Sequence, residues 1–265
     1  MIAQIDRPDD PRITPYAHVG DHAWLHDHGF FVAEGRLLAQ RLIAQWPASV
    51  HSILVSPTAL AGLQDEIPRD LPVYTANPSI LQGITGINFH RGCLALGRRP
   101  NPIQPAAFAS ARRLLAVEGI ANPDNVGGIF RVADAFGVEG ILLDPSTADP
   151  LYRKAVRTSM GSVFNVPFAR MDDWPRGLCD LATSAGFEMI AMTTRDEATP
   201  LAAFAKEARG RAIVMVGSEG DGLSGAVLQR ADHEVTIPTR TTVDSLNVVV
   251  AAGIALALLS GRDSG

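Results

Sequence analysis

The chain has 265 residues, of which 46% are hydrophobic and 19% are charged, and its formal net charge at pH 7 is −5. This balance excludes an intrinsically disordered chain and a protein that coats nucleic acid through bulk positive charge, although it allows a local basic patch. Apolar runs stay well below the ~20 residues of a membrane-spanning helix, and the N-terminal residues lack the pattern of a signal peptide, so we expect a cytoplasmic protein that does not enter a membrane.

The first 28 residues are rich in aspartate, proline and histidine, and they predict an extended or turning arm followed by a short helix at 21–28. His22 and His26 have a spacing that can hold a metal on a helix, but no cysteine or carboxylate completes a ligand set. The two cysteines, Cys93 and Cys179, are far apart and indicate neither a disulfide framework nor a zinc site. We therefore expect no metal site.

Between residues 30 and 97, strand patterns alternate with helix patterns. The expected strands are 30–34, 51–56, 71–75 and 93–97, and the expected helices are 35–45, 57–64 and 79–83. This alternation predicts a small, mostly parallel sheet that is covered on both faces. Three prolines within residues 98–105 then indicate a semi-rigid linker, so we place a first domain at 1–104 and a second at 105–265.

The second half alternates more strongly and predicts a larger α/β domain. The expected strands end at 117 or span 140–144, 164–168, 188–193, 211–217 and 235–238, and the expected helices are 129–136, 152–158, 178–185, 200–205 and 248–259. Continuous apolar strands such as 213–216 are typical of a parallel sheet buried on both faces. In such a sheet, ligands collect beyond the carboxyl ends of the strands.

Three polar loops of the second half could hold chemistry there. The loop before 129 could bind an anion at a helix N-terminus, or Asn125 could be an ordinary cap. The glycine-rich loop 216–224 lets backbone approach a flat ligand, although it matches neither the phosphate loop nor the dinucleotide fingerprint. The loop 238–247 precedes an apolar helix, so Ser245 or Asn247 could serve as an N-cap or belong to a site. Periodicity alone does not show whether these loops meet.

Motifs within these loops resemble those of a known enzyme family. Asn125-x-Gly-x-x-x-Arg131, Gly217-Ser-Glu219-Gly-x-Gly-Leu, and Ile237-Pro with Ser245-Leu-Asn247 look like the three signatures of the SpoU-class (TrmH-like) RNA ribose 2′-O-methyltransferases of the knotted SPOUT superfamily. This resemblance covers roughly residues 110–260. The first half resembles, more loosely, the L30e-like RNA-binding domain that precedes such domains, through residues 31–35, 71–74 and 91–95.

The resemblance implies a fold, a cofactor and partners. The fold would be a parallel sheet with a C-terminal deep trefoil knot, the cofactor S-adenosylmethionine, and the assembly a homodimer whose catalytic domains complete each other's sites. The substrate would be structured RNA, with the extra N-terminal domain favouring ribosomal over transfer RNA. The implied cofactor-binding residues are Thr193, Gly217, Ile237 and Leu246. The implied catalytic residues are Asn125, Arg131, Glu219, Ser245 and Asn247.

The implied mechanism is mainly one of positioning. The sulfonium already makes the methyl group electrophilic, so the protein has to align a ribose 2′-hydroxyl and manage its proton. A guanidinium stays protonated in ordinary protein settings, so we expect Arg131 to grip the adjacent phosphate and stabilise the developing alkoxide rather than act as a base. Asn247 and Ser245 would orient cofactor or hydroxyl, and Glu219 would fix its loop. Candidate RNA contacts are Arg91, Arg98, Arg99, Arg153, Lys154 and Arg157.

This chain departs from the family pattern in the third motif. Thr239 stands where methionine is usual, and Thr241 where glycine is usual, which could change the backbone of the loop or its room for cofactor. A non-catalytic RNA-binding protein that keeps the fold is therefore an alternative, although Arg131, Glu219 and Asn247 speak against it. A nucleotide-linked oxidoreductase is disfavoured because no strand is followed by the dinucleotide glycine fingerprint.

Overall fold

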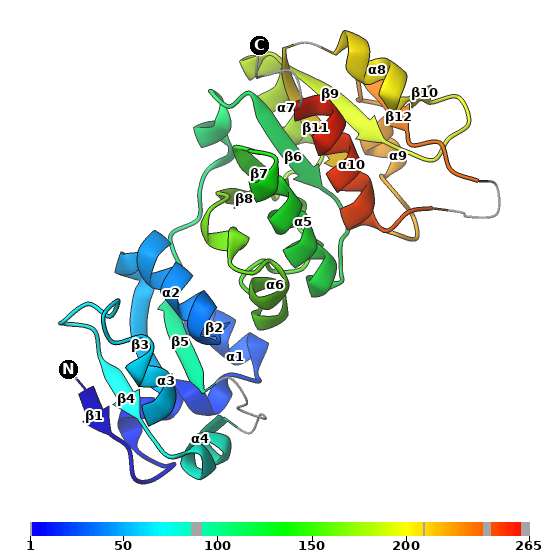
Figure 1. Ribbon diagram of the computed structural model, residues 1–265. Helices are drawn as coiled ribbons and strands as arrows, with labels where there is room; N and C mark the ends of the chain where they lie inside the picture. The colour runs from blue at the N-terminus through cyan, green and yellow to red at the C-terminus, as the bar shows by residue number, and fades with distance from the viewer. Residues whose placement is uncertain (1, 86–91, 209, 241–244, 261–265) are drawn as a thin grey trace. The chain divides into compact units, whose positions relative to one another are not determined.

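The chain folds into two compact units, shown in the computed structural model of Figure 1. The structure describes residues 2–85, 92–208, 210–240 and 245–260. The first unit comprises Met1–Asn101 with Leu151–Phe164, and the second comprises Pro102–Pro150 with Asn165–Gly265. The segment 151–164 thus groups with the first unit, whereas the predicted boundary at 104 placed it in the second.

The described residues of the first unit form a five-stranded sheet in the order β1-β4-β3-β5-β2. Its strands are β1 (Ile2–Gln4), β2 (Phe30–Glu34), β3 (Val50–Val55), β4 (Val73–Thr75) and β5 (Cys93–Arg98). The pairs β1/β4 and β3/β4 are parallel, but β2/β5 and β3/β5 are antiparallel. The expectation of a mostly parallel sheet was wrong here, because hydrophobic periodicity carries no information on strand direction.

Short helices cover the faces of this sheet. They are a 3₁₀ helix (Pro11–His18), α1 (His22–Asp27), α2 (Arg36–Gln45), a 3₁₀ turn (Pro47–Ser49), α3 (Pro57–Ala61) and α4 (Pro78–Thr85). Ile13, Tyr16 and Leu25 from the N-terminal helices pack with Val32 and Leu54 of the sheet into one hydrophobic cluster. The segment predicted as an extended arm is therefore helical over 11–18 and closes one side of the core.

The segment 151–164 forms α6 (Arg153–Thr158) and a 3₁₀ turn (Ser162–Phe164). An Arg153 nitrogen lies 3.3 Å from a carboxylate oxygen of Glu34 in β2. The ring of Phe164 lies 5.9 Å from that of Phe31 and 5.2 Å from that of Trp46, measured between centroids. An ion pair and aromatic packing thus attach this segment to the first unit, which sequence proximity could not reveal.

The described part of the second unit holds a seven-stranded sheet in the order β10-β12-β9-β11-β6-β7-β8, and each pairing in it is parallel. The strands are β6 (Arg113–Val117), β7 (Gly140–Leu143), β8 (Phe168–Arg170), β9 (Phe187–Met192), β10 (Thr199–Pro200), β11 (Arg211–Val216) and β12 (His233–Thr236). The parallel sheet was predicted correctly. The strand expected at 164–168 was misplaced, because Pro167 has no amide hydrogen to donate and β8 begins only after it.

The helices of the second unit flank this sheet. They are a 3₁₀ turn (Pro105–Phe108), α5 (Pro123–Ala135), α7 (Arg176–Ala185), α8 (Leu201–Glu207), α9 (Gly225–Leu228) and α10 (Val248–Ser260). The central strand β11 is buried on both faces, as the near-zero exposure of Ile213 and Val214 shows. α10, red in Figure 1, packs along the green α5. In the described part of the chain, no helix is long and apolar enough to cross a membrane.

The approach of α10 to α5 depends on a glycine. A Cβ built on Gly128 would lie 2.7 Å from a methyl carbon of Val249, so a larger residue there would push the helices apart. α5 begins at Pro123, and its N-cap is Asn122, whose side chain accepts a hydrogen bond from the amide of Asp124. The predicted loop is therefore helical from 123 onward, and Asn125 lies in the first turn instead of capping it, because proline at the first position sets the start.

Candidate active site

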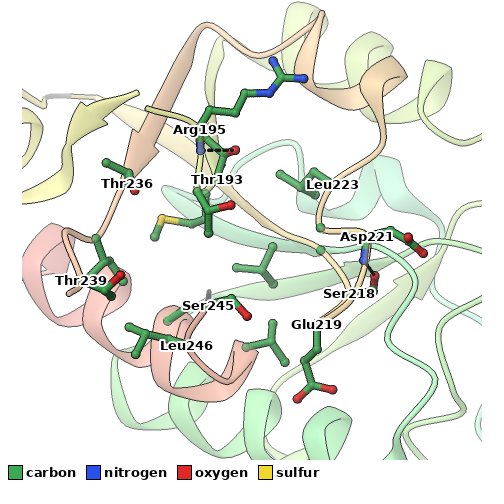
Figure 2. A pocket seen from close by; sticks show the side chains of 18 of the residues that line it. Thr193, Arg195, Ser218, Glu219, Asp221, Leu223, Thr236, Thr239, Ser245 and Leu246 are labelled. Carbon is green, nitrogen blue, oxygen red and sulfur yellow. Dashed lines mark hydrogen bonds between the residues drawn. The ribbon is translucent and has the colours of Figure 1, made fainter. Parts of the chain in front are cut away.

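A cavity of about 970 Å³ lies where the loops after β9, β11 and β12 meet the start of α10. Three segments supply most of its lining, residues 192–196, 216–223 and 236–240, and Ser245 and Leu246 complete it before α10. Figure 2 shows Thr193, Leu223, Thr239 and Ser245 around this space. Because parallel strands present their carboxyl ends at one edge, loops far apart in the sequence converge there.

The four predicted cofactor-binding residues line this cavity together. Thr193 follows β9, Gly217 follows β11, Ile237 follows β12, and Leu246 precedes α10. Thr239 lies in the lining as well, whereas Thr241 and Arg91 fall outside the described residues. The structure thus brings these predicted residues to one place, which periodicity alone could not establish.

The loop after β11 requires glycine at its first position. A Cβ on Gly217 would lie 2.2 Å from the backbone carbon and oxygen of Gly222, so any side chain would force the loop open. The loop is closed by a hydrogen bond from the amide of Gly222 to the carbonyl of Ser218 at 3.0 Å, and by one from the amide of Asp221 to the Ser218 hydroxyl at 3.1 Å. Its compact turn leaves backbone on the wall of the cavity.

Three predicted catalytic residues form one hydrogen-bond network. Glu219 Oε1 accepts hydrogen bonds from Asn125 Nδ2 at 2.6 Å and from Asn247 Nδ2 at 2.8 Å. Asn247 Nδ2 also lies 3.2 Å from Asn125 Oδ1. The network joins residues from all three polar loops, and Asn125, the innermost, is only 8% exposed. A single carboxylate therefore ties the starts of two helices to the glycine-rich loop.

Asn247 also caps α10. Its Oδ1 accepts a hydrogen bond from the amide of Val249 at 3.0 Å, while its Nδ2 donates into the network. The two interpretations of this position, a helix cap and a site residue, are compatible because the oxygen and nitrogen of one amide do different tasks. Ser245, the other candidate cap, lines the cavity instead.

Arg131 stands apart from these residues. It is exposed on α5 and does not belong to the lining of the cavity. Within the described ranges its side chain has no hydrogen bond or ion pair with another residue. In one copy of the described chain, Glu219 and Ser245 line the cavity, and Asn125 and Asn247 are hydrogen-bonded to Glu219. The Arg131 side chain joins neither the lining nor this network.

Two acidic residues that sequence reasoning missed hold the neighbouring loops. Glu118, directly after β6, accepts hydrogen bonds from the amide of Ser224 at 2.7 Å, from its hydroxyl at 2.8 Å, and from Trp174 Nε1 at 2.8 Å. It thereby fixes the far end of the glycine-rich loop. An acidic residue directly after a buried apolar strand is the signal that could have pointed to it.

Asp144 plays the same part after β7. It accepts hydrogen bonds from the amide of Gly119 at 3.0 Å and from the amide of Thr147 at 2.8 Å, and it also accepts from the side chains of Ser146 and Thr147. Burial alone would raise the pKa of Asp144, but the hydrogen bonds outweigh it and the pKa lies below its ordinary value. The carboxylate is thus held in its charged form.

The remaining predicted residues have other surroundings. His22 and His26 face each other at 6.2 Å between ring centroids, and among the residues that the structure describes no group of three or more histidines, cysteines or acids could hold a metal. Of the candidate RNA contacts, Arg153 is engaged by Glu34, Arg98 lies over the ring of Phe30, and Arg157 is exposed.

Comparison with known proteins places these features in context. The model of the SpoU rRNA Methylase family matches residues 112–257. An uncharacterized tRNA/rRNA methyltransferase of Mycobacterium bovis is 36% identical over 261 residues, which cover 96% of this chain and 90% of that protein. A 23S rRNA guanosine 2′-O-methyltransferase of Bacillus subtilis is 27% identical over 235 residues, which cover 87% of this chain and 88% of that protein.

Among solved structures, the AdoMet-bound rRNA methyltransferase from Sinorhizobium meliloti has the same fold. Its TM-score with this chain is 0.82 at 22% identity, and the match covers 97% of each chain. The likeness therefore extends over both units and not only over the residues that carry the three motifs.

Proposed function

This chain belongs to the SpoU rRNA Methylase family, and we propose that it transfers a methyl group from S-adenosylmethionine to a ribose 2′-hydroxyl of RNA. The observation that carries the proposal is the hydrogen-bond network of Asn125, Glu219 and Asn247, one from each motif, which adjoins the cavity through Glu219. The name of the Bacillus subtilis relative supports the 2′-hydroxyl as acceptor. The bound ligand of the Sinorhizobium meliloti structure supports the cofactor.

The residues of the cavity suit S-adenosylmethionine. The backbone at Gly217 and the apolar side chains of Leu223 and Leu246 would hold a flat adenine. The lining also carries both signs of charge in Asp196 and in Arg195, which pairs with Glu234 at 3.3 Å, as a ligand with an ammonium and a carboxylate group needs. When bound, the cofactor would supply an electrophilic methyl group at its sulfonium.

The polar network would position the substrate. Glu219 fixes both amides, so the start of α10 and the glycine-rich loop keep one geometry. Ser245, two residues before the capping Asn247, presents its hydroxyl at the cavity, where it can hold the ribose hydroxyl or the cofactor. Alignment of this kind supplies much of the rate enhancement when the methyl donor is already activated.

Arg131 would act from a second copy of the chain. It is exposed on α5, lies outside the cavity of its own described chain and has no partner there, so it is available to a neighbouring site. The apolar α10 exposes Val250 (49%) and Leu258 (42%), which supports a homodimer that covers this helix. Arg131 would grip the phosphate next to the ribose and stabilise the developing alkoxide, with the proton leaving to a phosphate oxygen or water.

Arg131→Lys tests this role. Lysine keeps the charge but not the planar fork, so a bidentate grip predicts a turnover loss of roughly tenfold or more. Full turnover by Arg131→Lys would exclude the bidentate role.

The finer features of the fold belong to the same proposal. The C-terminal segment would form a trefoil knot. β12 pairs with β9 on the side away from β11, yet the following helix α10 packs against α5 and contacts β11. The chain would therefore pass back beside the loops of the cavity. The first unit would be the L30e-like RNA-binding domain. Its presence favours ribosomal RNA over transfer RNA as the substrate.

The test is methyl transfer by the purified chain. We expect S-adenosylmethionine, but not NAD, to bind in a calorimetric titration. We also expect nuclease digests of treated ribosomal RNA to contain a new 2′-O-methylnucleoside by mass spectrometry. A methylated base in place of a methylated ribose would contradict the proposal that the ribose 2′-hydroxyl is the methyl acceptor. Binding of RNA without any methyl transfer would favour the non-catalytic alternative, for which the altered third motif, with Thr239 at the cavity, is the supporting observation.

A further inference from the structure

An aromatic and cationic cluster lies in the first unit, where β2 begins and β5 ends. Phe30 and Arg98 are directly opposite each other in the antiparallel ladder. The guanidinium carbon of Arg98 lies 5.5 Å from the centroid of the Phe30 ring, and the ring of His51 meets Phe30 edge-on at 5.2 Å. Arg99 donates a hydrogen bond through Nε to the carbonyl of Phe30 at 3.2 Å. We name these four residues the Phe30 cluster.

Contacts with the core of the first unit fix the position of the Phe30 cluster. The register of β3 against β5 shifts between Val50 and Ser52, so His51 sits at a bulge, a feature that re-aims a side chain. His51 Nδ1 lies 3.0 Å from the hydroxyl of Ser52, which is itself 2.8 Å from the buried hydroxyl of Tyr16. Phe30 packs against the core cluster that includes Tyr16. The two rings therefore have a fixed position before any ligand arrives.

The outer side of the cluster stays accessible. Arg98 is exposed, and Phe30 and His51 are half-buried. Burial, helped by the charge of Arg98, lowers the pKa of His51, which favours the neutral imidazole at physiological pH. The cluster thus combines two uncharged rings with the exposed guanidinium plane of Arg98, which lies over the Phe30 ring.

A second stack of rings lies on α1 in the same unit. Trp24 of α1 is sandwiched between His18 at 4.0 Å and His28 at 3.8 Å, with interplanar angles of 11° and 14°. Trp24 and Phe30 pack against the same core cluster, and His28 precedes Phe30 by two residues. The first unit therefore carries a second group of stacked rings on α1, packed against the same core as Phe30.

We propose that the Phe30 cluster is a stacking site for an unpaired nucleotide of the RNA substrate. Unstacked bases bind to aromatic rings and to guanidinium planes, and arginines beside the rings can contact the adjoining phosphate. A duplex offers no free base for such a site, so the site selects a loop, bulge or end. This inference rests on the proposed function only in taking RNA as the substrate.

The test uses the full chain and a single-stranded oligoribonucleotide that carries 4-thiouridine. We expect ultraviolet cross-links to map to the peptides that contain Phe30 or Arg98. We expect Phe30→Leu and Arg98→Ala to weaken binding of the oligonucleotide roughly tenfold, the scale of one stacked base. Arg98→Lys keeps the charge and should also weaken binding, whereas the matched control Arg7→Ala, on an exposed residue of the same unit, should not.

Thermal melting of each variant separates lost binding from lost folding, and the exposed Arg98 keeps the test valid even if Phe30→Leu unfolds. Cross-links that map only elsewhere, binding of Arg98→Ala as tight as that of Arg7→Ala, or equal affinity for a duplex would overturn the stacking site. S-adenosylmethionine titrated into the same variants should bind as to the parent chain. If the parent chain binds no S-adenosylmethionine but the oligonucleotide results hold, the proposed function fails and the stacking site does not.

Discussion

The two sheets of this protein build their functional surfaces in different ways. In the second unit every described pairing is parallel, so the loops after β9, β11 and β12 leave at the same edge and line a half-open cavity. In the first unit β2 and β5 are antiparallel, so the start of one strand meets the end of the other, and Phe30 faces Arg98 on an open surface. In this protein, strand direction thus distinguishes residues that gather around a half-open cavity from residues that pair on an exposed face.

The largest effect is expected at Glu219, because one carboxylate joins the loops that meet at the edge of the parallel sheet. Glu219→Ala removes the acceptor of Asn125 and Asn247, so the three loops lose their common anchor. We expect methyl transfer to fall by roughly 100-fold, since a shift of about 1 Å in a positioned site can have that effect. Asp180→Asn, on an exposed surface residue of the same unit, is the control and should retain activity. Near-normal turnover of Glu219→Ala would show that convergence at this edge does not serve catalysis.

A second effect, somewhat smaller, is expected at the glycine-rich loop. Gly217→Ala places a methyl group within 2.2 Å of the Gly222 backbone, so the loop must open at the wall of the cavity. We expect the affinity for S-adenosylmethionine in a calorimetric titration to fall roughly tenfold or more, as expected when a preformed wall is disturbed. Gly220→Ala is a matched control in the same loop, because no described atom lies within 4 Å of its added methyl group. Equal losses in the two variants would argue against a backbone wall.

The acidic residue behind this loop should have a smaller effect. Glu118 accepts hydrogen bonds from Ser224 with both carboxylate oxygens. In Glu118→Gln the side-chain NH₂ group would replace one of these oxygens and face a donor of Ser224. We expect the free energy of unfolding to fall by about 1 kcal/mol, the scale of a lost hydrogen bond at a half-buried group. We also expect the KM for S-adenosylmethionine to rise severalfold while kcat changes less. A change in kcat alone would instead place Glu118 in the chemistry.

Much of the second unit could be predicted from the sequence, because strong apolar strands and polar loops alternate there. The sequence motifs indicated Asn125, Glu219 and Asn247, which are hydrogen-bonded to one another in the structure. Glu118 and Asp144 were missed, since a single acidic residue after a strand carries no motif. The antiparallel pairs of the first unit were missed because alternation does not encode direction. The attachment of residues 151–164 depends on side-chain contacts far apart in the sequence, which no local pattern records.

Asp144, which follows β7 of the parallel sheet, should make the stability of the second unit depend on pH. Its pKa is lowered in the folded chain, so its charged form stabilises the fold above the unfolded pKa of about 3.9, and this contribution is lost as the pH falls through the folded pKa. We expect Asp144→Asn to lower the free energy of unfolding by about 1 kcal/mol at pH 7, the scale of one net hydrogen bond, and to abolish this part of the acid dependence. Urea unfolding at pH 7 and pH 3 measures both effects. The same loss at both values would contradict the charge-dependent role.

The smallest expected effect lies in the first unit, at the attachment of residues 151–164. Glu34→Gln removes the negative charge that pairs with Arg153 but keeps an oxygen acceptor. The side chains of Glu34 and Arg153 are 15% and 27% exposed. Global stability should fall by only about 0.5–1 kcal/mol, because partly solvated ion pairs contribute little. Hydrogen exchange should nevertheless quicken in α6, while the amides of β9 and β11 in the second unit stay unchanged. Since Phe164 still packs on Phe31 and Trp46, the segment should stay attached at that end. Faster exchange in β9 and β11 instead would show that this ion pair stabilises the parallel sheet, and the two sheets would then not be independent.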